Sequence, residues 1–267
     1  MVESFKAALR EGNMAENTIS AYIYAVNDYF AKHKTLNKRN LLLYKAKIIE
    51  QFKPKTVNLR IQALNKFLEH VDKPKLRLKS VKVQQRTYLE NVISQADYIF
   101  LKKRLKQEEN LMWYFVVRFL TATGARVSEL IQIKVEHVRI GYFDIYSKGG
   151  KVRRLFIPKL LRDEAKKWFE EIQQTTGYIF RNRFGERITT RGIAQQLKKY
   201  AERYGLNTNV VYPHSFRHRY AKNFLERFND IALLADLMGH ESIETTRIYL
   251  RRTSSEQQAI VDKVITW

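Results

Sequence analysis

The sequence predicts a mainly α-helical protein with one small β-sheet, divided into two domains. Apolar side chains recur every three or four residues over most of the 267 residues, which is the spacing of one helix face. Strand-like segments are short, and two of them flank Gly149 and Gly150. A basic stretch without helical periodicity separates two helical regions. We therefore expect domains at 1–73 and 91–267, joined by a linker at 74–90.

The first domain is expected to be helical throughout. Residues 14–32 place apolar side chains at helical spacing, and Asn17 or Thr18 is positioned to cap the start of this helix. Apolar residues repeat in the same way over 38–51 and 55–71, which predicts two further amphipathic helices.

Basic side chains lie along or beside the third of these helices and continue into the linker. Such a set of charges is typical either of a solvated face or of contact with DNA phosphates. The overall excess of positive charge favours contact with the DNA backbone. The expected DNA-binding residues are Lys53, Lys55, Arg60, Lys66, Lys75, Arg77, Lys79 and Lys82.

The second domain is expected to open with a helix that follows a possible capping box, formed by Ser94 and Asp97. The apolar stretch 111–124 is dense enough to be a buried helix, and Gly124 is well placed to end it. A further helix is predicted over 127–133.

A β-hairpin is predicted next, because residues 142–146 and 153–157 are strand-like and flank SKGGKV. A further short strand is expected at 178–181. The remaining helices are expected near 160–174, 190–204, 215–228 and 230–238. The second domain is therefore predicted to be mixed, with most of its residues in helices.

The charge balance indicates nucleic acid as the partner. The 49 Lys and Arg residues against 27 Asp and Glu residues give a formal net charge of +22 and a pI near 10.0. Such a surface attracts polyanions, and double-stranded DNA is the first to consider. No run of about 18 apolar residues is present, so we expect no membrane partner. The N-terminus lacks the apolar core of a signal peptide, so we expect a cytoplasmic protein.

The sequence offers little for metal or thiol chemistry. It contains no cysteine, and its six histidines do not have the spacing of a zinc site. No cluster of Asp and Glu resembles the site of a two-metal nuclease. Cleavage of DNA is therefore expected to need neither a metal nor another cofactor.

Residues 214–249 combine residue types that can hold a phosphate and attack it. His214 and Arg217 lie three residues apart just after Pro213, at a predicted helix start, so they share a face near the positive end of the helix dipole. Such a pair suits an anion. By itself, a pattern this short is more typical of packing or of an ordinary surface.

Five segments in order resemble the tyrosine recombinase family, the phage-type integrases and Xer-like site-specific recombinases. They are TGARVSEL, the strands around SKGGK, HSFRHRYA, LMGH, and a tyrosine nine residues after that histidine. The resemblance spans residues 94–250. The helices at 17–31 and 55–71 also resemble the core-binding domain of that family, so the resemblance implies a core-binding domain followed by a mixed α/β catalytic domain.

The resemblance implies a covalent mechanism and a catalytic set. The tyrosine would form a 3′-phosphotyrosyl bond and release a 5′ hydroxyl, and attack by another strand's 5′ hydroxyl would rejoin the backbone without ATP. The implied catalytic residues are Arg126, Lys148, His214, Arg217, His240 and Tyr249, with Glu129 supporting the first arginine.

These residue types suit phosphoryl transfer at neutral pH. A tyrosine has a pKa of about 10 in water, so Tyr249 must lose its proton as it attacks, and a nearby histidine could accept that proton. Two guanidinium groups match the charge that develops on the nonbridging phosphate oxygens. Lys148 could protonate the departing 5′ oxygen, and Lys151, across the diglycine, is an alternative acid.

Other roles remain open for several positions. Tyr249 could be a core aromatic residue, and His240 could satisfy a backbone carbonyl. Arg126 could pair with Glu129 for a structural reason alone. His218 and Arg219 follow the HxxR pair directly and are expected to pack or to contact DNA. The family usually has a small residue where Arg219 stands, so local packing there is expected to differ.

The two ends of the chain also lead to expectations. The chain begins almost at the core-binding helices, so we expect a simple recombination site without distant arm sequences, unless an arm-binding domain was removed. Near the C-terminus, Ile260, Val261, Val264 and Ile265 group as if on one helical face. In the family such a tail commonly docks on the neighbouring subunit, which implies a homotetramer on two DNA duplexes. Folding back on its own protomer is the alternative.

The sequence thus predicts a metal-independent, site-specific DNA recombinase that recognises a specific core site and integrates or excises a mobile element. Xer-like resolution of chromosome dimers and DNA inversion are alternatives within the family. A DNA-binding protein that has kept the fold without cleaving DNA, or a topoisomerase of the related type IB mechanism, are alternatives outside it.

Overall fold

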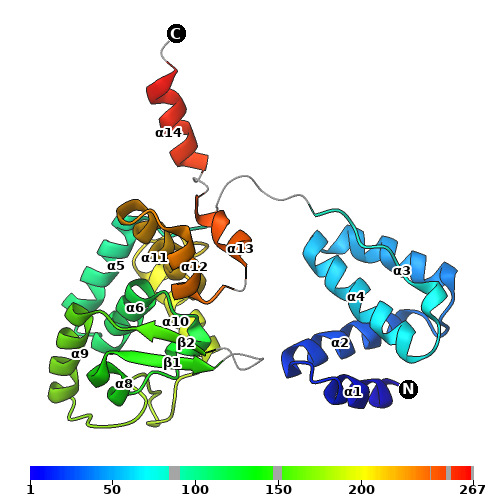
Figure 1. Cartoon of the computed structure of the whole chain (residues 1–267), viewed down its shortest axis with the longest axis horizontal. Coiled ribbons are helices and arrows are strands. Elements are labelled where there is room, and N and C mark those ends of the chain that lie inside the picture. Colours follow the sequence, from blue (N-terminus) through cyan, green and yellow to red (C-terminus); the bar gives the residue numbers. More distant parts are fainter. Residues whose placement is uncertain (84–90, 147–151, 241, 251–253, 266–267) are drawn as a thin grey trace. The chain divides into compact units, whose positions relative to one another are not determined.

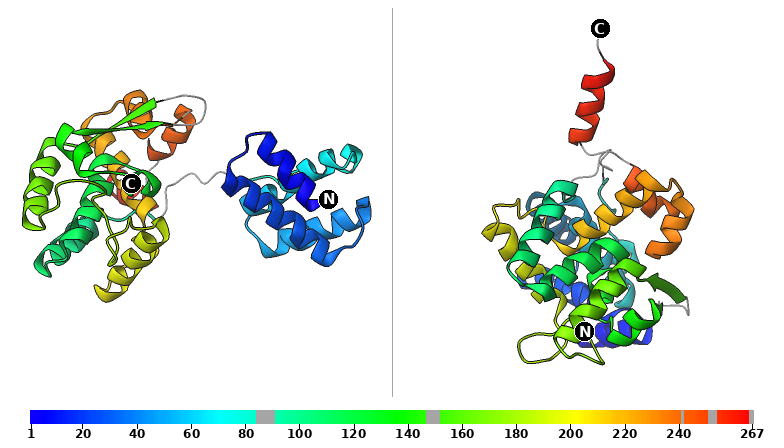
Figure 2. Two further views of the ribbon diagram at one scale, coloured as in Figure 1. Left: turned by 90° about the horizontal axis from the view of Figure 1, so that it is seen from below. Right: turned by 90° about the vertical axis from the view of Figure 1, so that its left-hand side faces the viewer.

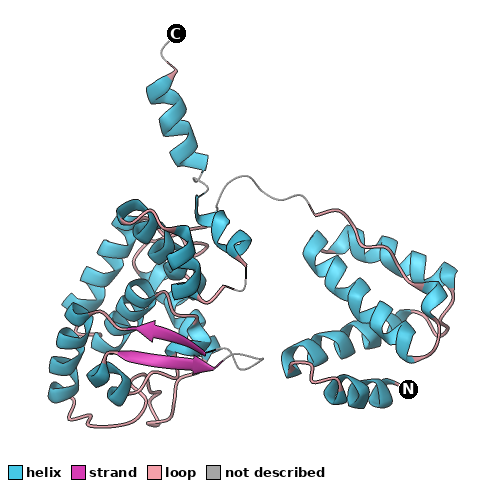
Figure 3. Ribbon diagram, viewed as in Figure 1, coloured by secondary structure: helices cyan, strands magenta, loops and turns pink. Residues whose placement is uncertain are grey.

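The computed structural model describes residues 1–83, 91–146, 152–240, 242–250 and 254–265 (Figure 1). The chain divides into two compact units, Met1–Gln85 and Arg86–Trp267. Helices make up most of both units, and the described sheet is one pair of antiparallel strands (Figure 3). The predicted fold class, mainly helical with a small sheet, is confirmed.

The first unit packs its helices around an apolar core with several aromatic rings. Tyr29 meets Tyr44 edge to face at 5.3 Å, and Phe5 meets Phe67 at 5.2 Å. Helix α1 was not predicted, because Phe5 and Leu9 are its only buried residues and give little periodicity. The elements are α1 (Val2–Glu11), α2 (Glu16–Lys32), α3 (Lys38–Gln51), α4 (Pro54–His70) and the 3-10 turn η1 (Pro74–Leu76).

The start of α2 differs from its prediction. The N-cap residue is Ala15, and no side chain caps the helix. Asn17 and Thr18 lie within the first helical turn, so the predicted cap is wrong. Glu16 in the first turn places a negative charge near the helix N-terminus, which is favourable without a capping side chain.

The linker begins later than predicted, because residues after η1 pack on the first unit. Leu78 is buried in the core of that unit. On α4, Asn65 accepts from the backbone N–H of Leu78 at 2.8 Å and donates to its carbonyl at 2.9 Å. Asn58 does the same with Val81, at 2.8 and 3.0 Å. Two asparagines thus tie this stretch to α4, and residues 84–90 lie outside the described residues.

The second unit is built around α6, which packs against α5, α9 and α11. Ser94 caps α5 by accepting from the N–H of Asp97 at 2.9 Å, and Gly124, with φ of 63°, ends α6, both as predicted. The elements are α5 (Gln95–Gln107), α6 (Leu111–Thr123), α7 (Val127–Leu130), α8 (Val135–Ile140), β1 (Tyr142–Tyr146), β2 (Val152–Phe156), α9 (Lys159–Glu171), α10 (Thr190–Arg203), α11 (Pro213–Arg227), α12 (Ile231–Met238), α13 (Ile243–Arg247), the 3-10 turn η2 (Ile248–Leu250) and α14 (Ser254–Val264).

The predicted hairpin is present, and it carries the sheet. β1 and β2 pair antiparallel, with Tyr142 opposite Phe156 and Ile145 opposite Arg153. β2 also lies beside α12, as the views in Figure 2 allow the reader to follow. The predicted turn at Gly149 and Gly150 lies outside the described residues.

The strand predicted at 178–181 is wrong. Within the described part of the chain this stretch makes only isolated bridges, from Tyr178 to Lys134 and from Arg181 to Arg187. Its side chains bond locally instead: Nε of Arg181 donates to the carbonyl of Tyr178 at 3.0 Å. A short apolar stretch such as this one predicts burial. It does not indicate whether a partner strand is available to form a regular sheet with it.

Arg219, the residue that departs from the family pattern, packs inside the second unit. It is 9% exposed, and its Nε and Nη2 donate to the carbonyl of Ile93 at 2.8 and 2.6 Å. Ser215 on the same helix accepts from the N–H of Ile93 at 2.7 Å. Helix α11 therefore fixes the backbone at the start of the second unit, and packing rather than DNA contact accounts for Arg219.

Helix α14 leaves apolar side chains in solvent. Val261, Val264 and Ile265 are 50%, 57% and 47% exposed. The side chain of Ile260, predicted to share their face, lies outside what the structure describes. Among the described helices of the whole chain, none is long and apolar enough to cross a membrane.

We predict that Asn65→Ala lowers the free energy of unfolding by about 1–3 kcal/mol, because the Leu78 N–H and carbonyl lose their partner where the chain is partly buried. Urea unfolding followed by circular dichroism measures this change. Gln62→Ala, at an exposed position on the same helix, is the matched control. Equal stability of the two variants would contradict the tie between this stretch and α4.

Candidate active site

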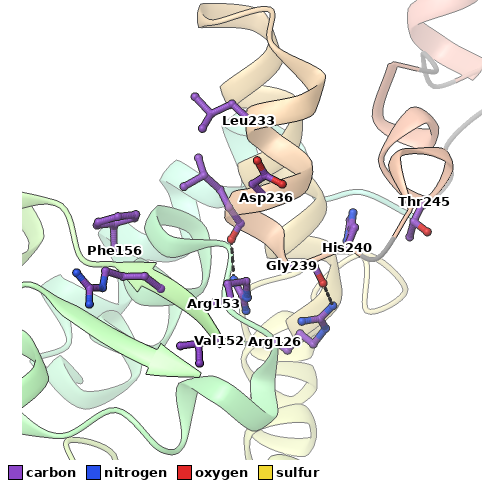
Figure 4. A pocket seen from close by; sticks show the side chains of 11 residues that line it. Arg126, Val152, Arg153, Phe156, Leu233, Asp236, Gly239, His240 and Thr245 are labelled. Carbon is purple, nitrogen blue, oxygen red and sulfur yellow. Dashed lines mark hydrogen bonds between the residues drawn. The ribbon is translucent and has the colours of Figure 1, made fainter. Parts of the chain in front are cut away.

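Several of the predicted site residues meet at the C-terminal end of α12. Arg126 precedes α7, Arg217 lies on α11, and His240 follows Gly239 at the end of α12. In Figure 4 the Arg126 side chain points toward Gly239, close to His240. Tyr249 comes from η2, a little further along the chain. Three segments far apart in the sequence thus supply one site.

Arg217 is buried and held from two sides. Only 1% of it is exposed. Its Nη1 donates to the carbonyl of Gly124 at 2.5 Å, and its Nη2 donates to the carbonyl of Met238 at 2.6 Å. Burial and the charge of Arg126 lower the pKa of Arg217 to about 10, which still leaves the guanidinium charged at neutral pH. The fold therefore fixes a permanent positive charge beneath the site.

Arg126 is more open, and Glu129 sets its direction. Its side chain is 41% exposed, and Nη1 pairs with Oε1 of Glu129 at 2.9 Å. Oε2 of Glu129 accepts from the backbone N–H of Arg126 at 2.7 Å, which completes a capping arrangement at the start of α7. Nη2 of Arg126 donates to the carbonyl of Gly239 at 3.0 Å. Arg126 thus presents an oriented guanidinium to solvent.

A third arginine, Arg153 on β2, belongs to the same cluster and was missed from the sequence. Its side chain is 10% exposed, and its Nη2 lies 2.6 Å from Oε2 of Glu129. Its Nη1 donates to the carbonyl of Leu237 at 2.6 Å (Figure 4). Strand alternation offered a signal, because Arg153 shares a face with buried Leu155 while Arg154 points the other way.

Glu129 lies between two of these arginines and stays ionised. Burial would raise the pKa of its carboxyl group, but the guanidinium groups of Arg153 and Arg126 outweigh burial and hold that pKa below its usual value. A charged carboxylate inside the cluster reduces the repulsion between its arginines.

His240 is neutral, and its contacts define its tautomer. Burial, together with the charges of Arg217 and Arg126, lowers the pKa of His240 to about 4. Its Nε2 faces Nη2 of Arg217 at 3.1 Å, so Nε2 accepts. Nδ1 then carries the proton and donates to Oγ1 of Thr246 at 2.7 Å. Both ring nitrogens of His240 thus face side chains, those of Arg217 and Thr246, and its catalytic role stays a prediction.

Tyr249 lies against two histidine rings. It is 4% exposed, and the ring centroids of His218 and His240 lie 5.3 and 6.1 Å from its own. His214 meets His218 edge to face at 4.6 Å. Burial raises the pKa of Tyr249, while the charges of Arg217 and Arg126 work in the opposite direction. The tyrosine is therefore a protonated, shielded phenol beside two neutral histidine rings.

The two histidines of the HSFRHR segment, His214 and His218, differ in their surroundings. His214 keeps solvent exposure, yet partial burial of its ring and the charges of Arg217 and Arg126 lower its pKa. His218 is buried, and its pKa falls to about 3 because of burial and the nearby His214 and Arg217. His218, expected only to pack or to touch DNA, thus packs directly on Tyr249.

The two lysines expected to act as the acid belong to the segment between β1 and β2. Lys148 and Lys151 lie outside the described residues, between the end of β1 and the start of β2. The strand that follows them does reach the site, because Arg153 is two residues beyond Lys151 and touches Glu129.

The residues expected to bind DNA in the first unit are exposed with one exception. Arg60 is 7% exposed, its Nη1 pairs with Oδ2 of Asp28 at 2.5 Å, and it lies over the ring of Phe52. Its assignment as a DNA contact is therefore wrong, because Arg60 is itself buried and its charge is paired with the partly buried Asp28. The other residues expected to bind DNA are all exposed: Lys53, Lys55, Lys66, Lys75, Arg77, Lys79 and Lys82.

Comparisons with known proteins agree with this geometry. The model of the phage integrase family matches residues 91–256. The tyrosine recombinase XerA of Pyrococcus horikoshii is 29% identical over 273 residues, covering 98% of this chain and 93% of the relative. Its similarity therefore extends through both units.

Solved structures share the fold. A lambda integrase dimer bound to a COC′ core site has a TM-score of 0.74 at 15% identity, covering 92% of this chain and 93% of that chain. The Tn1549 transposon integrase, in complex with transposon right end DNA, has a TM-score of 0.71 at 13% identity, covering 98% and 99%. At these identities the likeness concerns the fold alone.

We predict that stability of the second unit falls as the pH drops from 7 to 5, and that His218→Phe reduces this fall. The unfolded chain binds a proton at His218 below its ordinary pKa of about 6.5, whereas the folded chain does not until its pKa of about 3. The difference amounts to roughly 1–2 kcal/mol between these pH values. All three tryptophans lie in the second unit, so their fluorescence during urea unfolding reports it. An identical pH dependence in variant and wild type would contradict the neutral buried state.

Proposed function

The chain belongs to the phage integrase family and is a tyrosine recombinase, and on this premise we propose that it cuts and rejoins DNA at a specific core site through a 3′-phosphotyrosyl bond on Tyr249. The observation that carries the proposal is the convergence of Arg126, Arg217 and Tyr249 at one end of α12. A non-cleaving DNA-binding protein would not require this arrangement.

The two arginines are suited to a phosphate in transfer. Arg217 is fixed by the carbonyls of Gly124 and Met238, and Arg126 by Glu129 and Gly239. Donors that are already oriented need no rearrangement as negative charge develops on the nonbridging oxygens. Arg217, with its pKa of about 10, remains charged at neutral pH. This is the stabilisation that a metal ion supplies in other phosphoryl-transfer sites.

In the cleavage step, Oη of Tyr249 bonds to phosphorus and the bond from phosphorus to the 5′ oxygen breaks. The phenolic proton passes to a neutral histidine. His214 stays uncharged because its pKa is lowered, whereas Nε2 of His240 already accepts from Arg217, so His240 could take the proton only if that contact breaks. The 5′ oxygen takes a proton from the hairpin lysine, Lys148 or Lys151. Rejoining reverses these steps with the 5′ hydroxyl of another strand.

We propose that the first unit is the core-binding domain. The exposed cations on and after α4 would contact the DNA backbone, with Lys53 and Lys55 at the start of α4 and Lys79 and Lys82 in the stretch that α4 holds. Asn58 and Asn65 would keep that stretch on the helix, so its lysines extend the basic surface. Residues 84–90 then join this domain to the catalytic domain.

For the biological role we propose integration and excision of a mobile element, with which the similarity in fold to a transposon integrase is consistent. The similarity to XerA over nearly the whole chain favours a second candidate, Xer-like resolution of DNA dimers. The DNA around the gene separates the two. Flanking direct repeats with an excisionase gene would support the mobile element, and a conserved single site far from such repeats would support resolution.

The proposed assembly is a homotetramer on two DNA duplexes. Val261, Val264 and Ile265 expose apolar surface on α14 and after it, which a neighbouring catalytic domain would cover. Docking of this tail in trans would couple cleavage in one protomer to its neighbour.

We predict that the wild-type protein forms a covalent adduct with a nicked suicide substrate that carries its site, visible on a denaturing gel. Tyr249→Phe should abolish the adduct, because no hydroxyl remains to attack phosphorus. Arg217→Ala should reduce the adduct at least about 100-fold with much less effect on DNA binding. An adduct that persists in Tyr249→Phe would refute Tyr249 as the nucleophile.

A second prediction concerns the tail. Val261→Asp combined with Val264→Asp should lower the yield of complexes that contain two duplexes, because charged groups would replace the apolar surface that docks. Native gels with labelled duplexes measure this yield. Gln258→Asp, at an exposed position on the same helix, is the control. Binding of one protomer to a half-site should stay unchanged; normal pairing of duplexes by the double variant would contradict docking in trans.

A further inference from the structure

We propose that Arg153 is a positioning residue for the reaction: it anchors Glu129 and thereby holds Arg126 in the direction that receives the phosphate. The inference rests on the proposed strand cleavage. It assigns a role to a residue of β2 that was not among the catalytic residues implied by the sequence motifs.

The contacts of Arg153 bind three elements together. Its Nη2 lies 2.6 Å from Oε2 of Glu129 on α7, and its Nη1 donates to the carbonyl of Leu237 on α12 at 2.6 Å. The arginine itself belongs to β2. The same carboxylate orients Arg126 through Oε1 at 2.9 Å. Any movement of Glu129 therefore moves Arg126.

At the end of α12, the side chain of Arg153 passes so close to Gly239 that a larger residue at position 239 would not fit. Gly239 has φ of 62°, and a Cβ built on it would lie 2.3 Å from Cδ of Arg153. The glycine therefore serves the close passage of Arg153 as well as the turn that ends the helix. The carbonyl of Gly239 accepts from Nη2 of Arg126 at 3.0 Å. One glycine thus accommodates Arg153 and binds Arg126.

Arg153 is placed to support the site and not to bind the phosphate. Its side chain is 10% exposed, against 41% for Arg126, and its two contacts occupy both ends of its guanidinium. Without Arg153, Glu129 would remain a buried carboxylate with Arg126 as its one cationic partner in the described cluster. Arg126 would then be drawn toward Glu129, away from a phosphate in front of it.

The test compares two suicide substrates that differ at the scissile phosphate. In the second substrate a methylphosphonate replaces one nonbridging oxygen with a methyl group, so its transition state carries one negative charge fewer. A site with a misplaced Arg126 should lose less on this substrate. On the phosphate substrate, we expect Arg153→Ala to lower the rate of adduct formation by about 10–100-fold, somewhat less than loss of an oxyanion donor itself. On the methylphosphonate the loss should shrink to about 3-fold or less, by the same charge argument.

Two further variants sharpen the comparison. Arg126→Ala should show the same dependence on the substrate, and the double variant should be little worse than Arg126→Ala alone, because both changes act on one group. Arg154→Ala is the matched control: it lies one position along the strand, is exposed, and pairs with Asp144. It should react at the wild-type rate with both substrates.

Each outcome decides a different question. A wild-type protein that forms no adduct with the phosphate substrate would refute the proposed function. A wild-type rate in Arg153→Ala, or an equal loss on both substrates, would overturn the positioning role. If Arg153→Ala does not fold, Arg153→Lys is the second test. A single ammonium does not reproduce the two contacts that Nη1 and Nη2 of the guanidinium make separately, so the loss should again be greater on the phosphate substrate.

Discussion

The carbonyl end of α12 is the constraint on which the site depends. The carbonyls of Leu237, Met238 and Gly239 accept from three different arginines, which come from β2, α11 and the start of α7. A helix C-terminus carries partial negative charge, so it can gather cations without placing a carboxylate in the path of a phosphate. If α12 ended a residue earlier or later, these three carbonyls would be displaced, and all three guanidinium groups would lose the acceptors that orient them.

Much of this could be predicted from the sequence, because helix spacing and the family motifs are local patterns. α3 and α4 follow from periodicity, and Arg126, Arg217, His240 and Tyr249 follow from motifs that also occur in order. Arg153 does not, because its partner Glu129 lies 24 residues earlier on α7, and only the tertiary fold brings β2 beside that helix. The hairpin lysines lie outside the described residues, so their predicted role remains a prediction.

Arg60 and Arg153 show why charge alone is a poor guide in a protein this basic. Arg60 was assigned to DNA, but Asp28, from another helix, takes its charge in the interior of the first unit. Arg153 was passed over, yet it occupies the centre of the candidate site. In both cases an acidic partner far along the chain decides the role, and burying an arginine requires such a partner. A surplus of Lys and Arg therefore indicates the class of ligand, whereas the buried acids indicate which cations remain available to it.

The burial of Tyr249 bears on why the proposed reaction would rejoin DNA instead of hydrolysing it. The tyrosine is 4% exposed, among histidine rings, while Arg126 beside it is open to solvent. A phosphate would thus approach from the side of Arg126, and the covalent bond would form where protein limits the access of water. Water would then compete poorly with a 5′ hydroxyl that base pairing holds in place. The shielding that raises the pKa of Tyr249, and so makes it a reluctant nucleophile, would also preserve the phosphotyrosine until a strand arrives.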